Sequence, residues 1–271
     1  MDAGTRAFMR EWLLRKYGWQ DEAGYAGRWR TGGPFWTPDA GWAARSSTSP
    51  PPRPMPKSSA WSTRAASAKP SGTWRTCPTP GSCGDIMRPP LAGGAFDLIF
   101  SEGVLHHTPD TRAALSSLLP LLAPGGEIAF YVYARKAPLR EFADDFLRER
   151  MTKMPVEECW EACRAITSLG RALSRLRAEI EISEPIPPLG IAAGRYDVQR
   201  LIYDHVVKCF WNDSFDFEEN NLVNFDWYHP AYAHRHTPEE VEGWVREGGL
   251  ELLWLHTEPS GITCRARVKT S

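Results

Sequence analysis

The sequence predicts an α/β fold with a doubly wound, mostly parallel sheet, an antiparallel C-terminal strand and a helical insertion. Two compact apolar runs, residues 95–100 and 127–133, flank a segment whose leucines recur at helical spacing. A strand, a helix and a strand in so short a stretch form one parallel crossover unit. Helical periodicity over residues 136–212 predicts the insertion, and two more strands are expected within residues 250–268.

Length, charge and cysteine pattern exclude several classes of protein. A chain of 271 residues can bury a large core, and its net charge of −1 creates no overall field that would attract nucleic acid or an anionic membrane. No apolar run is long enough to span a bilayer, and the N-terminus lacks the basic segment followed by an apolar segment that is typical of a signal peptide. We therefore expect a cytoplasmic protein. Its six cysteines are scattered without a CxxC pair, so we expect free thiols rather than disulfides or structural zinc.

Three regions are expected along the chain. Residues 1–30 form an N-terminal helical segment, because aromatic and leucine side chains recur at near-helical spacing before Gly18. Residues 31–135 and 237–271 form the core, in which residues 35–36 are a short strand. Residues 136–236 form the helical insertion, which we interpret as a cover for a substrate.

The core elements carry clear start and stop signals. Pro109 and Asp110 open the helix after the first apolar run, Pro120 shortens it, and Pro124-Gly125-Gly126 closes it. Near the C-terminus, Thr237 and Glu240 form a capping box that starts a helix. A strand follows at 250–256, and alternating apolar residues at 262–268 predict its antiparallel neighbour.

The composition changes sharply over residues 42–83. This window has no Val, Ile, Leu, Phe or Tyr and no acidic residue, and its six basic residues give it a charge of +6. Strands need β-branched and aromatic residues, so we expect poorly formed or disordered chain where further strands would stand. Two interpretations stay open. The window is a basic Pro/Ser/Thr linker, or its codons are read out of frame, which agrees better with its three tryptophans.

Four short motifs of the core follow one another in order: Gly84-Asp85-Ile86, Phe96-Asp97-Leu98-Ile99-Phe100-Ser101, Val104-Leu105-His106-His107 and Leu122-Ala123-Pro124-Gly125-Gly126. In this order and spacing they resemble the class I S-adenosylmethionine-dependent methyltransferases, in particular the small-molecule "type 11" group. The resemblance covers residues 84–134 well and 237–268 more loosely. It implies a Rossmann-like fold, S-adenosylmethionine as the cofactor and a small-molecule methyl acceptor.

The resemblance also implies a role for particular residues. Those that would contact the cofactor are Asp39 and Gly41 in a glycine-rich loop, Asp85 and Ile86 at the adenine, and Ser101, Glu102 and Val104 near the sulfonium. His106, and after it His107, are the candidates for a catalytic base, because an imidazole titrates near neutral pH. Trp227, Tyr228 and His229 belong to an aromatic loop that would cover the acceptor. The histidines of residues 229–236 and Asp226 have no fixed ligand spacing, so we expect no metal.

Departures from the family pattern predict impaired cofactor binding. Trp42 and the residues after it stand where two more glycines belong, and no carboxylate is present in 42–83 to take the ribose hydroxyls. A non-catalytic binding protein derived from a methyltransferase fold is therefore the alternative. A nicotinamide enzyme is disfavoured, since the chain has no G-x-G-x-x-G after its first strand. The identity of the acceptor and the oligomeric state do not follow from the sequence.

Overall fold

The computed structural model describes residues 14–19, 35–36 and 85–270. The chain divides into two compact units. The sheet unit comprises residues 1–134 and 234–271, and the helical unit comprises residues 135–233. No helix in the described ranges is long and apolar enough to cross a membrane. The expectations for residues 42–83 lie outside the described residues.

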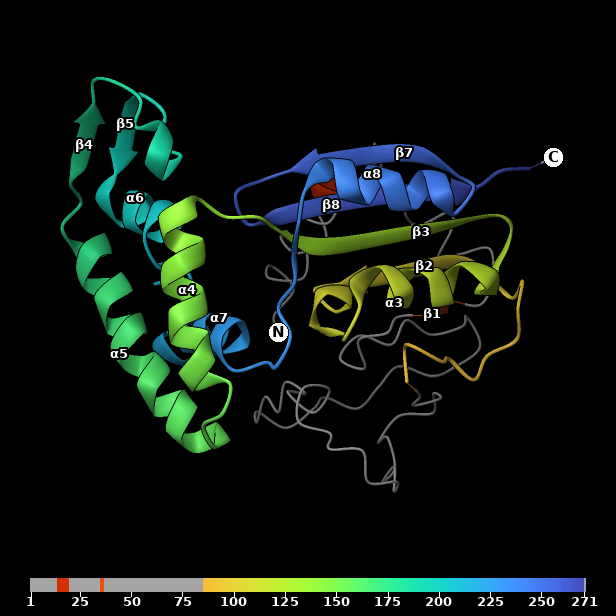
Figure 1. Cartoon of the computed structure of the whole chain (residues 1–271), viewed down its shortest axis with the longest axis horizontal. Helices are drawn as coiled ribbons and strands as arrows, with labels where there is room; N and C mark the ends of the chain where they lie inside the picture. The colour runs from red at the N-terminus through yellow and green to blue at the C-terminus, as the bar shows by residue number, and fades with distance from the viewer. Residues whose placement is uncertain (1–13, 20–34, 37–84, 271) are drawn as a thin grey trace. The chain divides into compact units, whose positions relative to one another are not determined.

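Among the described residues, the sheet unit has six strands (Figure 1). They are β1 (Phe35–Trp36), β2 (Phe96–Glu102), β3 (Leu122–Ala134), β6 (Arg235–His236), β7 (Leu250–Thr257) and β8 (Gly261–Val268). The strand order is β1-β2-β3-β8-β7, and β6 pairs with the end of β3. Strands β1, β2, β3 and β6 pair in parallel, whereas β8 is antiparallel to both of its neighbours. The mostly parallel sheet with an antiparallel C-terminal strand is thus confirmed.

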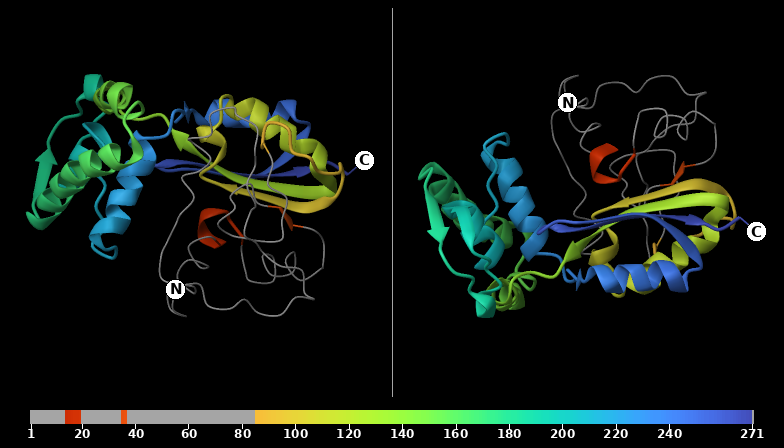
Figure 2. Two further views of the ribbon diagram at one scale, coloured as in Figure 1. Left: turned by 90° about the horizontal axis from the view of Figure 1, so that it is seen from below. Right: turned by 90° about the horizontal axis from the view of Figure 1, so that it is seen from above.

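Helices α3 (Thr111–Leu118) and α8 (Pro238–Glu247) cover one face of this sheet, and residues 14–19 lie on the other (Figure 2). The main core lies under the two helices and includes Leu115, Ile128 and Val245. On the opposite face, Tyr17 and Trp19 pack against side chains of β2 and β3. The burial of both faces accounts for the nearly continuous apolar sequence of the central strands.

The helix boundaries follow the expected signals. The carboxylate of Asp110 accepts the N–H of Ala113 at 2.9 Å and caps α3. The α-helix ends at Leu118, where a single 3₁₀ turn containing Pro120 follows. Both hydrogen bonds of the capping box between Thr237 and Glu240 are present at the start of α8. These caps satisfy N–H groups that a helix leaves without partners in its first turn.

The segment Pro124-Gly125-Gly126 differs from its prediction. It lies inside β3, where we expected it to close a helix. The register with β2 passes from Phe96↔Leu122 to Leu98↔Glu127, so the extra residues form a bulge. Gly125 has a φ of 73°, and a Cβ at Gly126 would lie 2.8 Å from the carbonyl oxygen of Phe96. Glycines therefore shape this bulge.

The helical unit contains four helices and one hairpin. The helices are α4 (Pro138–Met151), α5 (Val156–Arg175), α6 (Val198–His205) and α7 (Phe217–Tyr228), and the hairpin strands are β4 (Glu179–Ile182) and β5 (Gly194–Asp197). The prediction of helices throughout 136–212 is wrong for the hairpin. The prediction of an aromatic loop at residues 225–230 is also wrong for its first four residues, because α7 extends to Tyr228. Three buried asparagines on α7 remove the amphipathic pattern that would have revealed it.

Candidate functional site

The carboxyl end of β2 presents the first two candidate residues. Ser101 is completely buried, and its hydroxyl has no hydrogen-bond partner among the described residues. Glu102 follows it, and the strand then ends at Gly103, whose φ of 73° turns the chain. A side chain at Gly103 would meet no described atom within 4 Å. The end of the strand therefore combines a buried polar atom with a backbone position that no described atom crowds.

The carboxylate of Glu102 binds two residues from the N-terminal segment. Lys16 donates to Oε1, and the hydroxyl of Tyr17 donates to Oε2. The Lys16 ammonium also lies 3.7 Å from the ring centroid of Tyr131. Burial, and next the charge of Glu102, raise the pKa of Tyr17 well above its ordinary value. Tyr17 was predicted to lie in the N-terminal helical segment, and no pattern in the sequence connects it or Lys16 with Glu102.

A short 3₁₀ turn, Leu105–His107, holds the two candidate bases. His106 is completely buried, and its ring stacks on that of Tyr133 with centroids 3.6 Å apart and planes at 28°. The ring of His107 meets His106 edge-on at 4.3 Å. Val104 precedes the turn, and its carbonyl accepts the N–H of His107 at 2.9 Å. The turn thus fixes His106 against β3 immediately after the end of β2.

A second histidine-containing segment supports the same turn. The backbone N–H of His234 donates to the carbonyl of His106 at 2.9 Å, and its Nε2 lies 3.1 Å from the carbonyl oxygen of Thr108. Strand β6 then pairs with the end of β3, opposite Tyr133. These histidines were grouped in sequence with the acceptor loop, whereas the structure joins them to the turn that carries His106.

Asp85 and Ile86 have local partners. Asp85 is exposed, and its Oδ1 accepts the N–H of Met87 at 2.9 Å, as in an Asx turn. Ile86 packs against the main core, and its carbonyl accepts the hydroxyl of Ser117 at 2.6 Å. Among the described residues, Asp85 makes no hydrogen bond to Ser101 or His106. Asp39 and Gly41 lie outside the described residues.

The three predicted acceptor residues belong to the helical unit. Trp227 and Tyr228 are buried in the last turn of α7, and the hydroxyl of Tyr228 donates to the Lys208 carbonyl at 2.8 Å. His229 stacks on Phe225 with ring centroids 4.7 Å apart. Two of the three are therefore packed side chains of a helix, where an aromatic loop was predicted. No group of three metal-ligating side chains occurs in the described part of the chain.

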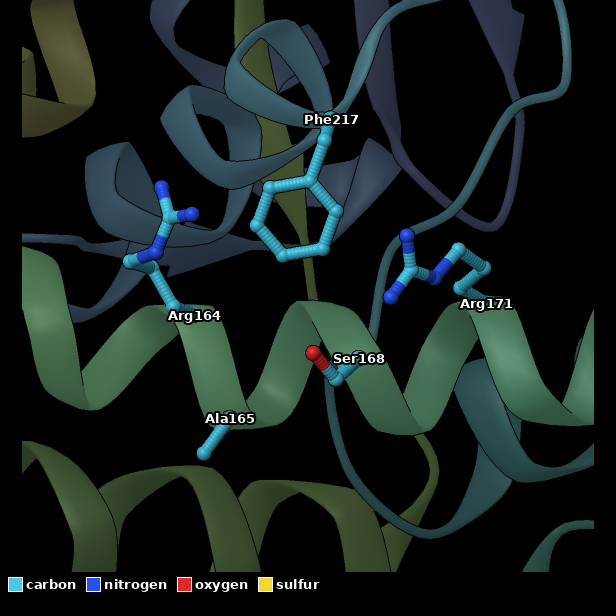
Figure 3. Close-up of a pocket in the computed structure, with 5 residues that line it drawn as sticks. All are labelled: Arg164, Ala165, Ser168, Arg171 and Phe217. Carbon is cyan, nitrogen blue, oxygen red and sulfur yellow. The ribbon is translucent and has the colours of Figure 1, made fainter.

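An open pocket of about 300 Å³ lies elsewhere on the helical unit (Figure 3). Arg164 and Arg171 extend from α5 on either side of the Phe217 ring, with guanidinium carbons 4.8 and 4.9 Å from its centroid. Arg164 also pairs with Glu218. None of the predicted site residues lines this pocket.

Comparison with known proteins agrees with the sheet unit. The methyltransferase domain family matches residues 60–130, which include Asp85, Ser101 and His106 but not Asp39 or Gly41. An uncharacterized methyltransferase of Mycobacterium tuberculosis is 45% identical over 49 residues, 18% of this chain and 25% of that protein. The tRNA (carboxymethyluridine(34)-5-O)-methyltransferase of Xenopus tropicalis is 37% identical over 71 residues, 25% of this chain and 11% of that protein.

The chain thus spans about a quarter of the mycobacterial relative's length. Among solved structures, an S-adenosylmethionine-dependent methyltransferase from Mesorhizobium loti aligns over 68% of this chain and 67% of its own, with 14% identity and a TM-score of 0.33. The identity and the TM-score of this match are both low. On the ordered motifs of residues 84–134, the matched domain and the relatives, this part of the chain is similar to S-adenosylmethionine-dependent methyltransferases.

Proposed function

We propose that the sheet unit transfers a methyl group from S-adenosylmethionine to a small-molecule acceptor. The observation that carries the proposal is the completely buried His106, stacked on Tyr133 directly after the end of β2. Ligands of open α/β sheets bind at the carboxyl ends of the strands. A buried imidazole held at that edge is suited to take a proton from an acceptor hydroxyl.

The residues at the carboxyl end of β2 fit S-adenosylmethionine. Ser101 offers a buried hydroxyl without a partner among the described residues, and no described atom lies within 4 Å of a side chain placed at Gly103. Ser101 and Val104 would hold the methionine part, and Asp85 and Ile86 the adenine. The cofactor supplies a methyl group already activated by a positive sulfur.

The chain's own residues then align the acceptor and handle its proton. Tyr133 fixes the plane of the His106 ring, so that a ring nitrogen of His106 can accept the acceptor's proton. Alignment of reacting groups contributes up to about 7–11 kcal/mol in such reactions. His107, edge-on to His106, assists in orienting the imidazole.

We further propose that this chain binds the cofactor weakly. Residues 42–83 contain no Asp or Glu that could bind the ribose hydroxyls, and Trp42 follows Gly41 where the family has small residues. Both oxygens of Glu102 are already bound by Lys16 and Tyr17, which leaves this carboxylate less available to a ligand.

A small acceptor is favoured over RNA. The Xenopus relative is named for action on tRNA, but residues 135–233 of this chain contain 13 basic and 17 acidic residues. Binding to RNA gains most of its affinity from basic side chains that neutralise phosphates. The helical unit, with its negative charge, is therefore a poor RNA surface.

A transfer assay tests the proposal. The full chain is supplied with millimolar S-adenosylmethionine and a panel of small hydroxyl compounds, with bulk tRNA as a separate arm, and methylated products are detected by mass. We expect a methylated small molecule from the wild type and from His256→Ala, whose histidine is exposed on β7. We expect at least a hundredfold slower transfer from His106→Ala. Methylation of tRNA alone would contradict the small-molecule acceptor.

A non-catalytic binding protein is the second candidate. It is favoured by the way in which Lys16 and Tyr17 already bind Glu102 at the strand end. If the folded wild type transfers no methyl group to any acceptor at millimolar cofactor, this second function replaces the first.

A further inference from the structure

The open pocket of the helical unit lies on one face of α5. Its volume of about 300 Å³ is at the lower end of the range for pockets that bind small ligands. Arg164, Ser168 and Arg171 follow one another at intervals of four and three residues, so they project from the same face of the helix. Phe217, the first residue of α7, forms another wall (Figure 3). The described residues that line the pocket thus provide two guanidinium groups, a hydroxyl and an aromatic ring, and none of them is acidic.

The charge of Arg164 is balanced by two acidic neighbours. Its Nη1 donates to Oε1 of Glu218, and its Nε lies 3.7 Å from Oε2 of Glu161. Its guanidinium carbon also lies 4.8 Å from the ring centroid of Phe217. Arg164 is therefore a charge-compensated wall of the pocket and has little capacity left for the negative charge of a ligand.

Arg171 has no carboxylate partner among the described residues. Its guanidinium carbon lies 4.9 Å from the ring centroid of Phe217 and 5.8 Å from that of Trp211, and its side chain forms no hydrogen bond or ion pair with any described residue. Asp213, close to Trp211 in sequence, has other partners. Its Oδ1 accepts Trp211 Nε1 at 2.7 Å, and its Oδ2 lies 3.9 Å from Nη2 of Arg177. The two aromatic rings therefore orient the Arg171 guanidinium and leave its N–H donors available.

Ser168 supplies a second donor on the same face of α5. Hydroxyl groups inside a helix often donate to the carbonyl four residues earlier, and the adjacent Thr167 donates to the Cys163 carbonyl at 3.0 Å. The Ser168 hydroxyl forms no such bond, nor any other with a described residue. Figure 3 shows its oxygen on the pocket side of the helix. The hydroxyl and the guanidinium of Arg171, three residues apart, can therefore bind one ligand together.

We propose that this pocket binds a small aromatic monocarboxylate, with Arg171 as its anchor. A guanidinium group matches the two oxygens of a carboxylate with two parallel N–H bonds. The Ser168 hydroxyl would donate to one of the same oxygens, and the Phe217 ring offers the aromatic body of the ligand a contact. The site lies wholly in the helical unit and does not depend on the proposed methyl transfer.

The charges around the pocket favour one negative charge over two. Arg171 provides one uncompensated positive charge, whereas the carboxylates of Glu161 and Glu218 lie at Arg164. These carboxylates would repel a dianion such as phosphate more strongly than a monoanion. A single carboxylate that reaches Arg171 is therefore the better match.

Calorimetric titration of the full chain with benzoate at neutral pH tests the site, with benzamide, acetate and inorganic phosphate as separate arms. Benzamide keeps the ring without the charge, and acetate keeps the carboxylate without the ring. We expect saturable binding of benzoate with a dissociation constant of about 1 mM, and roughly tenfold weaker binding of each of the other three. The absence of saturable benzoate binding overturns the proposal, as does binding of any of the other three that is as tight as that of benzoate.

A matched pair of variants locates the binding on α5. Arg171→Gln removes the charge from the pocket, whereas Arg175→Gln makes the same change at an exposed position of the same helix that does not line the pocket. We expect roughly tenfold weaker benzoate binding in Arg171→Gln, because the charge-assisted hydrogen bonds are lost. Arg175→Gln is expected to keep the wild-type affinity. Equal benzoate affinity in the two folded variants contradicts the proposal.

Two further variants test the other walls of the pocket. Ser168→Ala removes one hydrogen bond and is expected to weaken benzoate binding about threefold. Phe217→Leu removes the ring but keeps an apolar side chain, and a loss of about threefold is expected there as well. If circular dichroism shows that Arg171→Gln does not fold, Ser168→Ala takes its place, and unchanged benzoate affinity in that variant overturns the site.

Discussion

The imidazole of His106 lies face to face with the phenol ring of Tyr133, with ring centroids 3.6 Å apart. This stack joins the turn after β2 to the end of β3, two segments that meet only because the strands are parallel neighbours. The orientation of the candidate base therefore depends on a side chain of the adjacent strand.

Removing the Tyr133 ring tests that dependence. Tyr133→Phe keeps the stacked ring and is expected to keep wild-type transfer and stability. Tyr133→Ala is expected to slow transfer at least tenfold and to lower the free energy of unfolding by about 1–3 kcal/mol, since it removes an aromatic pair and buried area. Urea unfolding followed by circular dichroism measures the second effect. Equal transfer rates in the two variants would show that the stack does not position His106.

The pair of Tyr17 and Glu102 predicts a stability change at high pH. Burial and Glu102 raise the pKa of Tyr17 in the folded state above its ordinary value of 10.0. The stabilising contribution of its neutral form is therefore complete below pH 10 and is lost as the pH rises toward the folded pKa. We expect the stability of the wild type to fall more steeply between pH 9 and 11 than that of Tyr17→Phe. Parallel curves in urea unfolding would contradict this.

Lys208 predicts that the stability of the folded chain rises with pH, the opposite of the effect of Tyr17. Its pKa falls from 10.5 to about 7 on folding, so the unfolded chain binds the proton more tightly and wild-type stability rises with pH between about 7 and 10.5. Lys208→Met removes this penalty and is expected to stabilise the chain by about 2–4 kcal/mol at pH 7. The gain should shrink as the pH approaches 10. A destabilised Lys208→Met, with the exposed control Lys153→Met unchanged, would show that the ammonium is compensated in the folded state.

The bulge in β3 predicts contrasting effects of two glycine substitutions. A Cβ at Gly126 would lie 2.8 Å from the Phe96 carbonyl oxygen and 2.9 Å from that of Ala123, so Gly126→Ala is expected to destabilise by about 2 kcal/mol. Gly243 lies within α8, and its Cβ would meet nothing closer than 3.8 Å. Gly243→Ala should therefore stabilise by about 0.5–1 kcal/mol. Melting temperatures of the two variants that move in the same direction would refute this description of the bulge.

The sequence predicted the elements whose signals are local. The apolar run of β2, the cap at Asp110 and the capping box of α8 identified their elements because periodicity and capping depend on neighbouring residues. The α7 helix was missed, although Asp216 and Glu219 form a capping box at its start. Its buried asparagines bind backbone groups across the helical unit, and no local pattern reports such long-range partners.

The candidate site likewise contains residues that local sequence signals predicted and residues that only long-range contacts bring together. The positions of Ser101 and His106 followed from the end of a predicted strand, because parallel strands bring their carboxyl ends to one edge. The bonds from Lys16 and Tyr17 to Glu102 span more than 80 residues and had no signal in the sequence. The contacts of Arg164 and Arg171 with Phe217 likewise depend on how the helices pack.

The most direct test of the account is calorimetric titration of the full chain with S-adenosylhomocysteine. The central claim is that the edge at Ser101 and His106 holds this nucleoside, but weakly. It predicts saturable binding at one site with a dissociation constant of about 1 mM. Micromolar affinity would contradict the proposed impairment, and the absence of any saturable binding would contradict the methyltransferase site itself.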